Sequence, residues 1–383
     1  MQFIKTPYLQ LPDTDGITVM WETDTESTTR LLVWDALCPD IWDVQYSPLG
    51  EPQVFYGENG YMHRVKATGL KSEKDYCYQT VSCTKDSELT SERHVFRTKS
   101  PENGNLSFAV TSETGGGPAT VPVMEKLVNS MATERPDFLL FVGDMVLDGR
   151  QKPEWDHYLF TPFRSLICHT PFYHCAGNHE YHSDYMQRFL ATSEKGYYDF
   201  TYGCAHFIAL DSTQLADHYD EQKNYYPFKL TQPLTEENPQ VRFLIDSLKK
   251  SGAKWKFVYL HYPPYVAGAW QAAVLRPLCR IFEKYGVDIV FASHTKIYER
   301  SHPIRNEAVD FSKGVRYLVV GGAGECPEWF HHKKAWHTAK SRAIPHFVHV
   351  SITPEHMELQ AIDLNGKLFD NLVMQKPDRQ SEG

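Results

Sequence analysis

The chain has 383 residues, of which 42% are hydrophobic and 23% charged, values typical of a globular protein with room for two domains. Its formal net charge of -9 argues against a general nucleic-acid binder, because contacts to phosphates need a basic surface. No apolar run reaches the ~18 to 20 residues of a membrane-spanning helix, so we expect no membrane anchor.

The first residues and the cysteines bear on the compartment. Residues 1–7 contain no apolar segment of the kind found in signal peptides. The cysteines form no Cys-x-x-Cys pair, and Cys168, Cys204 and Cys279 lie near or within apolar runs, where buried free thiols are expected. We therefore expect a reduced, cytoplasmic protein, or a secreted one if a leader has been removed.

Residues 1–98 have the pattern of a β domain. Strand-like runs at 17–21, 30–34 and 76–81 are separated by clusters of Gly, Pro and Asp. The segment 68–81 is similar to the loop-and-strand corner of a fibronectin-III-like sandwich, with Tyr76 as the corner tyrosine. The domain contains no cluster of ligand-type side chains, so we expect it to brace its neighbour.

A polar, turn-rich linker at 99–105 separates this domain from residues 106–375, where the pattern changes. Apolar spacing there predicts alternating strands and helices, which indicates an α/β domain. The predicted strands cover 106–110, 138–142, 256–260, 287–292, 316–320, 347–352 and 357–363, and the predicted helices cover 121–135, 241–250 and 275–285.

Side chains that bind metals follow four of the apolar runs in this domain. Asp144 ends Phe-Val-Gly-Asp, Asn178 lies in Gly-Asn-His-Glu, and His261 and His294 each follow a predicted strand. Because α/β folds collect catalytic loops at the carboxyl ends of their strands, we expect these side chains to lie close together. One Asp, one Asn and two His offer the mixed oxygen and nitrogen donors that suit a divalent transition metal.

The ordered motifs carry a family resemblance that extends over nearly the whole chain. Together with the N-terminal sandwich, the chain resembles the calcineurin-like metallophosphoesterases, and within them the purple acid phosphatases, in the residues Glu113, Asp144, Asn178-His179-Glu180, His261, His294 and Tyr298-Glu299-Arg300. The resemblance implies a four-layer α-β-β-α sandwich over residues 106–375. It also implies hydrolysis of a small phosphate mono- or diester by metal-activated water, with one or two divalent ions of zinc, manganese or iron per chain.

The resemblance also assigns a role to each residue of the intact half of the site. It makes Asp144 the carboxylate that bridges two metals, while Asn178, His261 and His294 complete the second metal site. His179 is not a ligand in this scheme. It faces the substrate, where it protonates the leaving alkoxide or holds the phosphate.

The other half of the site departs from the family pattern. Glu113, Leu147 and Lys296 stand where the first metal should take Asp, Tyr and His. Leu147 has no ligand atom, and a protonated Lys296 opposes a cation placed beside it. Our hypothesis is that Lys296 pairs with Glu113 and Asp144 in place of the first metal, which leaves a mononuclear site.

Two alternatives remain open at this point. The chain is either a weak or inactive pseudophosphatase that binds a phosphate ligand or serves a structural role, or a dinuclear enzyme in which Glu113, Asp148 or water rebuilds the first site. For Asp148 the competing role is to cap its own turn. Glu180 is expected to orient His179 or the turn that carries it.

Three further residues are candidates for a substrate-recognising rim. His331 and His332 lie in a cationic, aromatic segment after the Gly321-Gly322 turn, and Tyr265 follows His261 closely. The alternatives are a solvated loop for the histidines and rigid-turn chemistry for the segment of Tyr265.

Overall fold

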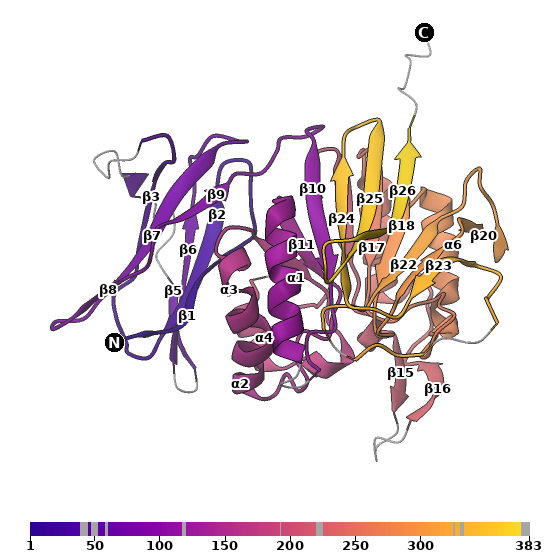
Figure 1. Cartoon of the computed structure of the whole chain (residues 1–383), viewed down its shortest axis with the longest axis horizontal. Coiled ribbons are helices and arrows are strands. Elements are labelled where there is room, and N and C mark those ends of the chain that lie inside the picture. Colours follow the sequence, from indigo (N-terminus) through magenta and orange to yellow (C-terminus); the bar gives the residue numbers. More distant parts are fainter. Residues whose placement is uncertain are drawn as a thin grey trace, which may run out of the picture.

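The computed structural model describes residues 1–38, 45–46, 53–57, 60–116, 120–191, 193–219, 225–324, 326–329 and 333–376. It confirms the predicted fold class, because a domain built from strands alone lies beside a domain of sheets and helices (Figure 1). No helix among the described residues is long and apolar enough to cross a membrane.

The N-terminal β domain consists of two packed sheets. One has the order β1-β2-β6-β5, and the other β4-β3-β7-β8 with β9 paired to β7. Apolar side chains of both sheets, such as Trp21 and Tyr78, form its core. Its strands are β1 (Phe3–Gln10), β2 (Ile17–Thr23), β3 (Arg30–Asp35), β4 (Gln45–Tyr46), β5 (Gln53–Gly57), β6 (Gly60–Ala67), β7 (Asp75–Cys83), β8 (Glu88–Thr90) and β9 (His94–Arg97).

The predicted corner tyrosine makes the expected backbone contact. The hydroxyl oxygen of Tyr76 accepts a hydrogen bond of 2.9 Å from the backbone N–H of Lys71, five residues upstream. A tyrosine that bonds the backbone of the preceding loop is the arrangement found at the corner of fibronectin-III-like sandwiches.

Two large sheets form the centre of the α/β domain. The first has the order β12-β11-β10-β24-β25-β26, and the second β13-β14-β17-β18-β22-β19-β23. The first contains β10 (Leu106–Thr111), β11 (Phe138–Phe141), β12 (Phe172–His174), β24 (His346–Ile352), β25 (His356–Asp363) and β26 (Leu368–Gln375). The second contains β13 (Tyr198–Tyr202), β14 (Ala205–Ala209), β17 (Trp255–Tyr259), β18 (Ile289–Ala292), β19 (Tyr298–Ser301), β22 (Arg316–Val320) and β23 (Thr338–Arg342).

Helices cover the outer faces of both sheets (Figure 1). They are α1 (Val121–Glu134), α2 (Lys152–Trp155), α3 (Thr161–Ile167), α4 (Asp184–Phe189), α5 (Pro239–Lys250) and α6 (Arg276–Tyr285). A π-helical turn, Asp156–Phe160, joins α2 to α3. Small two-stranded sheets are formed by β15 (Ala216–Tyr219) with β16 (Tyr225–Leu230), and by β20 (Ile304–Arg305) with β21 (Ala308–Val309).

The alternation of side chains along β10 explains why the layers stack in this way. Phe108 and Val110 point into the core between the two sheets, whereas Ala109 points to the helices on the other face. Because successive side chains of a strand face opposite sides, an apolar strand such as this one can be buried between two layers. The result is the four-layer α-β-β-α arrangement.

The predicted helices have the expected positions, with ends that local chemistry explains. The second predicted helix begins at Pro239 because the side chain of Asn238 accepts hydrogen bonds from the next free backbone N–H groups, and proline is tolerated in a first turn. The third ends at Gly286, whose φ of 67° suits glycine.

Buried charges join the two domains. The carboxylate of Glu22 on β2 has 0% side-chain exposure and lies 2.7 Å from the Lys5 ammonium, 3.0 Å from that of Lys152 and 3.2 Å from the Arg188 guanidinium. Lys5 also lies 2.7 Å from Asp156. Both domains therefore contribute charges to one network.

Candidate metal centre

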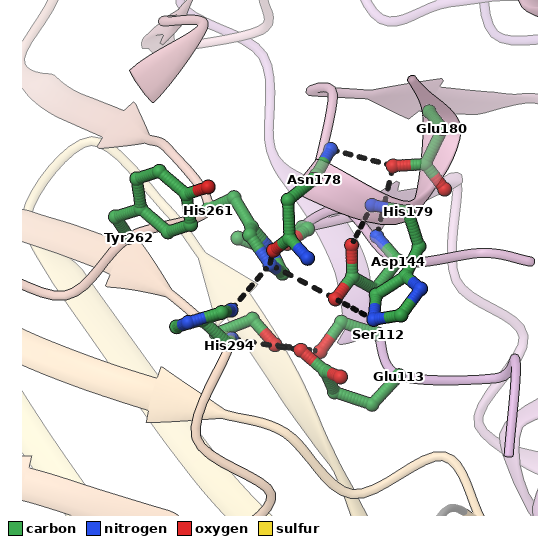
Figure 2. Close-up of polar contacts among 12 residues, drawn as sticks. Ser112, Glu113, Asp144, Asn178, His179, Glu180, His261, Tyr262 and His294 are labelled. Atoms are coloured by element: carbon green, nitrogen blue, oxygen red, sulfur yellow. Dashed lines mark hydrogen bonds and ion pairs between the residues drawn. The ribbon is translucent and has the colours of Figure 1, made fainter. Parts of the chain in front are cut away.

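Four turns at the carboxyl ends of strands meet at one point (Figure 2). Asp144 follows β11, Asn178 follows β12, His261 follows β17 and His294 follows β18. The Nε2 atom of His261 lies 3.1 Å from Oδ2 of Asp144, 3.2 Å from Oδ1 of Asn178 and 3.2 Å from Nδ1 of His294.

This spacing fits one transition-metal ion. Ligands at ~2.0 to 2.2 Å from a tetrahedral ion lie ~3.3 to 3.5 Å from one another. The distances around His261 are close to that value, and the donor atoms of Asp144, His261 and His294 all lie within 4.8 Å of one another in a buried position. The donor set therefore suits zinc, manganese or iron.

A hydrogen bond fixes the orientation of His261. Its Nδ1 lies 2.9 Å from the backbone carbonyl of Val142, so in the neutral ring Nδ1 carries the proton. The lone pair of Nε2 then points at the other three donors. Histidines that bind metals are commonly held by such a bond to a carbonyl group.

Three residues around the centre have strained backbones. Glu113, Asp144 and His294 adopt left-handed conformations, with φ values of 60°, 51° and 65°. For a residue with a side chain this conformation costs about 1 to 3 kcal/mol, and such strain collects at functional sites. The fold therefore bears a cost that brings these side chains together.

Charges at the centre are strongly coupled. Burial favours a neutral Asp144, but the neighbouring His261 outweighs burial and holds the Asp144 pKa well below its usual range. Burial likewise opposes a charge on His261, but Asp144 raises the His261 pKa to about 9. Burial, followed by the charge of His261, lowers the His294 pKa well below its usual range. A metal that binds here at neutral pH must therefore displace a proton from His261.

His179 lies beside the four donors and differs from them in exposure. Its side chain is 28% exposed, and its Nε2 lies 3.9 Å from Oδ2 of Asp144. Its Nδ1 lies 2.7 Å from the carbonyl oxygen of Leu147, and its backbone N–H donates to Asp144. The contact with the Leu147 carbonyl thus fixes the orientation of the imidazole, and its Nε2 faces the centre.

Glu180 binds the backbone of two neighbouring turns, as expected for an orienting residue. Its carboxylate accepts hydrogen bonds from the N–H groups of Asp144, Met145 and Gly177 at 3.0, 2.6 and 2.5 Å. Burial and then the charge of Asp144 raise the Glu180 pKa to about 7. The carboxylate therefore connects the turn of Asp144 to that of Asn178.

The altered half of the site has a different set of contacts. Oε1 of Glu113 accepts hydrogen bonds from the Ser293 hydroxyl at 2.6 Å and the His294 backbone N–H at 2.7 Å. The side chain of Leu147 is 43% exposed. Asp148 accepts hydrogen bonds from the backbone and guanidinium of Arg150, as a turn-capping carboxylate does.

The hypothesis for Lys296 needs a correction. In the part of the chain that the structure describes, its ammonium pairs with Glu328, with Nζ 3.5 Å from Oε1, rather than with Glu113 or Asp144. Backbone hydrogen bonds in both directions explain this pairing, because Lys296 N–H donates to the Glu328 carboxylate and Glu328 N–H donates to the Lys296 carbonyl. These contacts direct the lysine toward the 326–329 segment.

Sequence reasoning missed the rings of His218 and Trp270, which lie near His294, whereas the segment that contains Tyr262 was weighed as a wall of the pocket. The ring centre of His218 lies 4.9 Å from that of His294, that of Tyr262 lies 4.8 Å away and that of Trp270 lies 6.0 Å away. The indole N–H of Trp270 donates to Glu328, the partner of Lys296. His218 and Trp270 belong to no ligand motif, so only the folded chain identifies them.

The rim prediction fails for one residue and stays a prediction for two. Tyr265 is 2% exposed, packs against Tyr317 and lies under the guanidinium of Arg276, so it cannot form a rim. His331 and His332 lie outside the described residues. Cys168, Cys204 and Cys279 are buried free thiols, as predicted.

Known proteins share the sequence pattern and the fold. The Calcineurin-like phosphoesterase family matches residues 106–298. Acid phosphatase type 7 of Mus musculus is 25% identical over 92% of this chain and 89% of its own length. Purple acid phosphatases 15 and 13 of Arabidopsis thaliana are 25% and 26% identical over 70% and 71% of this chain, which spans only 54% and 57% of their lengths.

A solved structure extends the likeness in fold to both domains. The purple acid phosphatase PPD1 from seeds of yellow lupin (Lupinus luteus) matches 97% of this chain and 74% of its own, with a TM-score of 0.80 at 16% identity. With the family match over half of the sequence and purple acid phosphatases among its relatives, the chain belongs to the calcineurin-like phosphoesterases.

Proposed function

We propose that the protein hydrolyses a phosphate mono- or diester at a centre that holds one divalent metal. Asp144, Asn178, His261 and His294 would hold the ion. When bound, such an ion supplies Lewis-acid stabilisation and lowers the pKa of water. As part of this proposal, residues 1–98 form the bracing β domain and residues 106–375 the phosphoesterase domain.

One observation carries the proposal. The Nε2 atom of His261 lies 3.1 to 3.2 Å from a donor atom of each of the other three residues, so one side of the site is arranged for an ion. On the other side, Glu113 binds the backbone turn of His294 and Lys296 pairs with Glu328. Because Leu147 has no donor atom and Oε1 of Glu113 already binds the turn of His294, few ligands remain for a second ion.

His179 is the residue that we assign to the substrate. The carbonyl group of Leu147 accepts a hydrogen bond from Nδ1, which leaves Nε2 at the partly exposed edge of the centre. When both ring nitrogens are protonated, the proton on Nε2 is available either to a phosphate oxygen or to the leaving alkoxide. Asp144 orients the same residue through the backbone N–H of His179.

The experiment measures metal content and turnover together. Elemental analysis of the purified protein and of its His261→Ala variant should differ by one ion per chain, and a chromogenic aryl phosphate should be hydrolysed by the unaltered protein once zinc, manganese or iron is supplied. If losing one Lewis-acid contact removes several kcal/mol, the rate should be about 10² to 10⁴ below that of a dinuclear relative. A difference of two ions per chain between these two proteins would refute the mononuclear centre.

The altered half of the site favours a second candidate, a pseudophosphatase that binds a phosphate ligand without turnover. Here too Asp144, Asn178, His261 and His294 would hold one ion. The two candidates differ in a single result, because the pseudophosphatase would bind inorganic phosphate in a metal-dependent way and release no product from any ester.

A further inference from the structure

A second group of metal-binding side chains lies where the two domains meet. His94 belongs to β9 of the β domain, while Cys168 and His169 follow α3 of the α/β domain. One donor atom from each lies within 4.8 Å of the other two. These residues belong to neither half of the centre described above.

Contacts between the two domains fix the positions of these three residues. His94 faces Tyr78 across the β7–β9 pair, and the Tyr78 hydroxyl donates a hydrogen bond of 2.7 Å to the carbonyl of Cys168. The next residue on β9, Val95, contacts the ring of His169 through its backbone. Each domain thus fixes the position of ligands in the other.

His169 is oriented as a metal ligand requires. Its Nδ1 lies 2.8 Å from the carbonyl oxygen of Val95 and 3.2 Å from the Val95 backbone nitrogen, so the backbone of Val95 holds the ring. The tautomer with the proton on Nδ1 leaves the lone pair of Nε2 for an ion. The ring of His94 lies 5.5 Å from that of His169, at an angle of 71°. Both imidazoles can therefore direct a nitrogen toward a common point.

Cys168 supplies the sulfur donor. It is 4% exposed, and its Sγ has a weak contact of 3.6 Å with the Ser165 carbonyl. Burial raises the Cys168 pKa to about 11, so the metal-free residue is a thiol that loses its proton when an ion binds. His169 is exposed, which leaves a fourth position open to water.

We propose that His94, Cys168 and His169 form a separate site for a thiophilic divalent metal, zinc above all, which links the two domains. Two nitrogens, one sulfur and a water make a four-coordinate zinc site. Donors around zinc lie about 3.5 Å apart, so the distances between these donor atoms, now within 4.8 Å, would shorten by up to about 1.3 Å when the ion binds. Its ion would stabilise the folded chain, because the unfolded chain does not bring these three ligands together.

Cobalt distinguishes this site from the catalytic centre. The full chain is stripped of metal with a chelator and titrated with Co²⁺, which gives a near-ultraviolet charge-transfer band only when a thiolate binds it. The catalytic centre contains no sulfur donor, so the band reports on the new site alone. We expect the band to grow to one equivalent per chain and to be removed by Zn²⁺.

Variants assign the band to these residues. It should disappear in Cys168→Ser and in His169→Gln, while Cys326→Ser, which removes an exposed thiol, and His261→Ala should retain it. His169 is exposed, so its variant should fold even if Cys168→Ser does not. Absence of the band in the wild-type chain, or its persistence in His169→Gln, would overturn the proposal. Neither result depends on turnover of a phosphate ester.

Discussion

The two halves of the candidate centre use similar turns in different ways. In one half, donor atoms of Asp144, Asn178 and His294 lie 3.1 to 3.2 Å from Nε2 of His261. In the other, Glu113 accepts hydrogen bonds from the turn of His294, and Lys296 pairs with Glu328. The turns of one half therefore place donor atoms close together, whereas hydrogen bonds and an ion pair fix the turns of the other half.

The largest effect is expected when the imidazole of His261, which lies nearest to the other three donors, is removed. His261→Ala should abolish metal binding at this centre and lower turnover by about 10³-fold or more, because Lewis-acid catalysis supplies several kcal/mol. Metal analysis and hydrolysis of an aryl phosphate measure both effects. His349→Ala, which removes a buried histidine of β24, is the matched control and should keep its metal. A His261→Ala protein with full metal content would contradict the assignment.

The next test separates chemistry from metal binding. His179→Ala should reduce turnover by about 10²- to 10⁴-fold, the usual contribution of a general acid, without changing the metal content. His179→Gln, which keeps a hydrogen-bond donor, should recover part of the affinity for inorganic phosphate. If the trace of activity in the wild-type chain is unaffected by both changes, the pseudophosphatase is the better description.

The coupled pair predicts a pH dependence of the metal-free protein. The His261 pKa is about 9 when folded, above its value of about 6.5 in an unfolded chain. A raised pKa stabilises the fold fully below pH ~6.5, and this stability is lost as the pH rises through 9, by on the order of 3 kcal/mol. Denaturant unfolding from pH 6 to 10 measures the loss. His261→Ala should remove this slope, and an equal slope in that variant would contradict the cause.

Adding metal ligands at positions 147 and 296 tests whether the other half of the centre can bind an ion. The double change Leu147→Tyr with Lys296→His supplies phenolate and imidazole donors, so we expect one more ion per chain than in the unaltered protein. We also expect a rate gain of about 10- to 100-fold, from a Lewis-acid contact of ~1.4 to 2.8 kcal/mol. With iron, the new phenolate should also give a visible colour that the wild-type chain lacks. Leu147→Phe with Lys296→His controls for ring size. No additional ion in either double variant would show that Glu113 prevents the second site.

The smallest effect is expected at the ion pair of Lys296. Glu328→Gln should lower the free energy of unfolding by about 1 kcal/mol or less, as for other partly exposed pairs. The side chains of Lys296 and Glu328 are 18% and 21% exposed. Asp75→Asn, which removes an exposed partner of Arg97, is the control and should change even less. A larger loss accompanied by a change in metal content would connect the pair to the centre.

Much of this fold could be predicted because its signals are local. The apolar spacing at Met124, Leu127, Val128 and Met131 defines α1, and the left-handed Arg135 before Pro136 ends it. Order along the chain also indicated that Asp144, Asn178, His261 and His294 would lie together, since each follows a strand. Their role as ligands stays a prediction.

The predictions for Lys296 and Tyr265 were wrong because the positions of these side chains depend on contacts between distant segments. Lys296 was expected beside Glu113, but its partner is 32 residues away, in a loop with no ligand motif. Tyr265 was expected at a rim because it follows His261, but its ring lies in the core beneath α6. Sequence patterns describe the spacing within an element, whereas these outcomes are decided by which loops meet after folding.

The network around Glu22 has a consequence for how this molecule can be divided. Removal of residues 1–98 would leave Lys152, Arg188 and Asp156 without their buried counter-charges, and would uncover apolar side chains that pack against Tyr8 and Met20. Water would solvate the uncovered charges, but the uncovered apolar surface would cost about 25 cal/mol per Å², against a stability of about 5 to 15 kcal/mol for a typical domain. The phosphoesterase half is therefore not a portable module. We expect the α/β domain to be stable only when it is expressed together with the β domain that covers this surface.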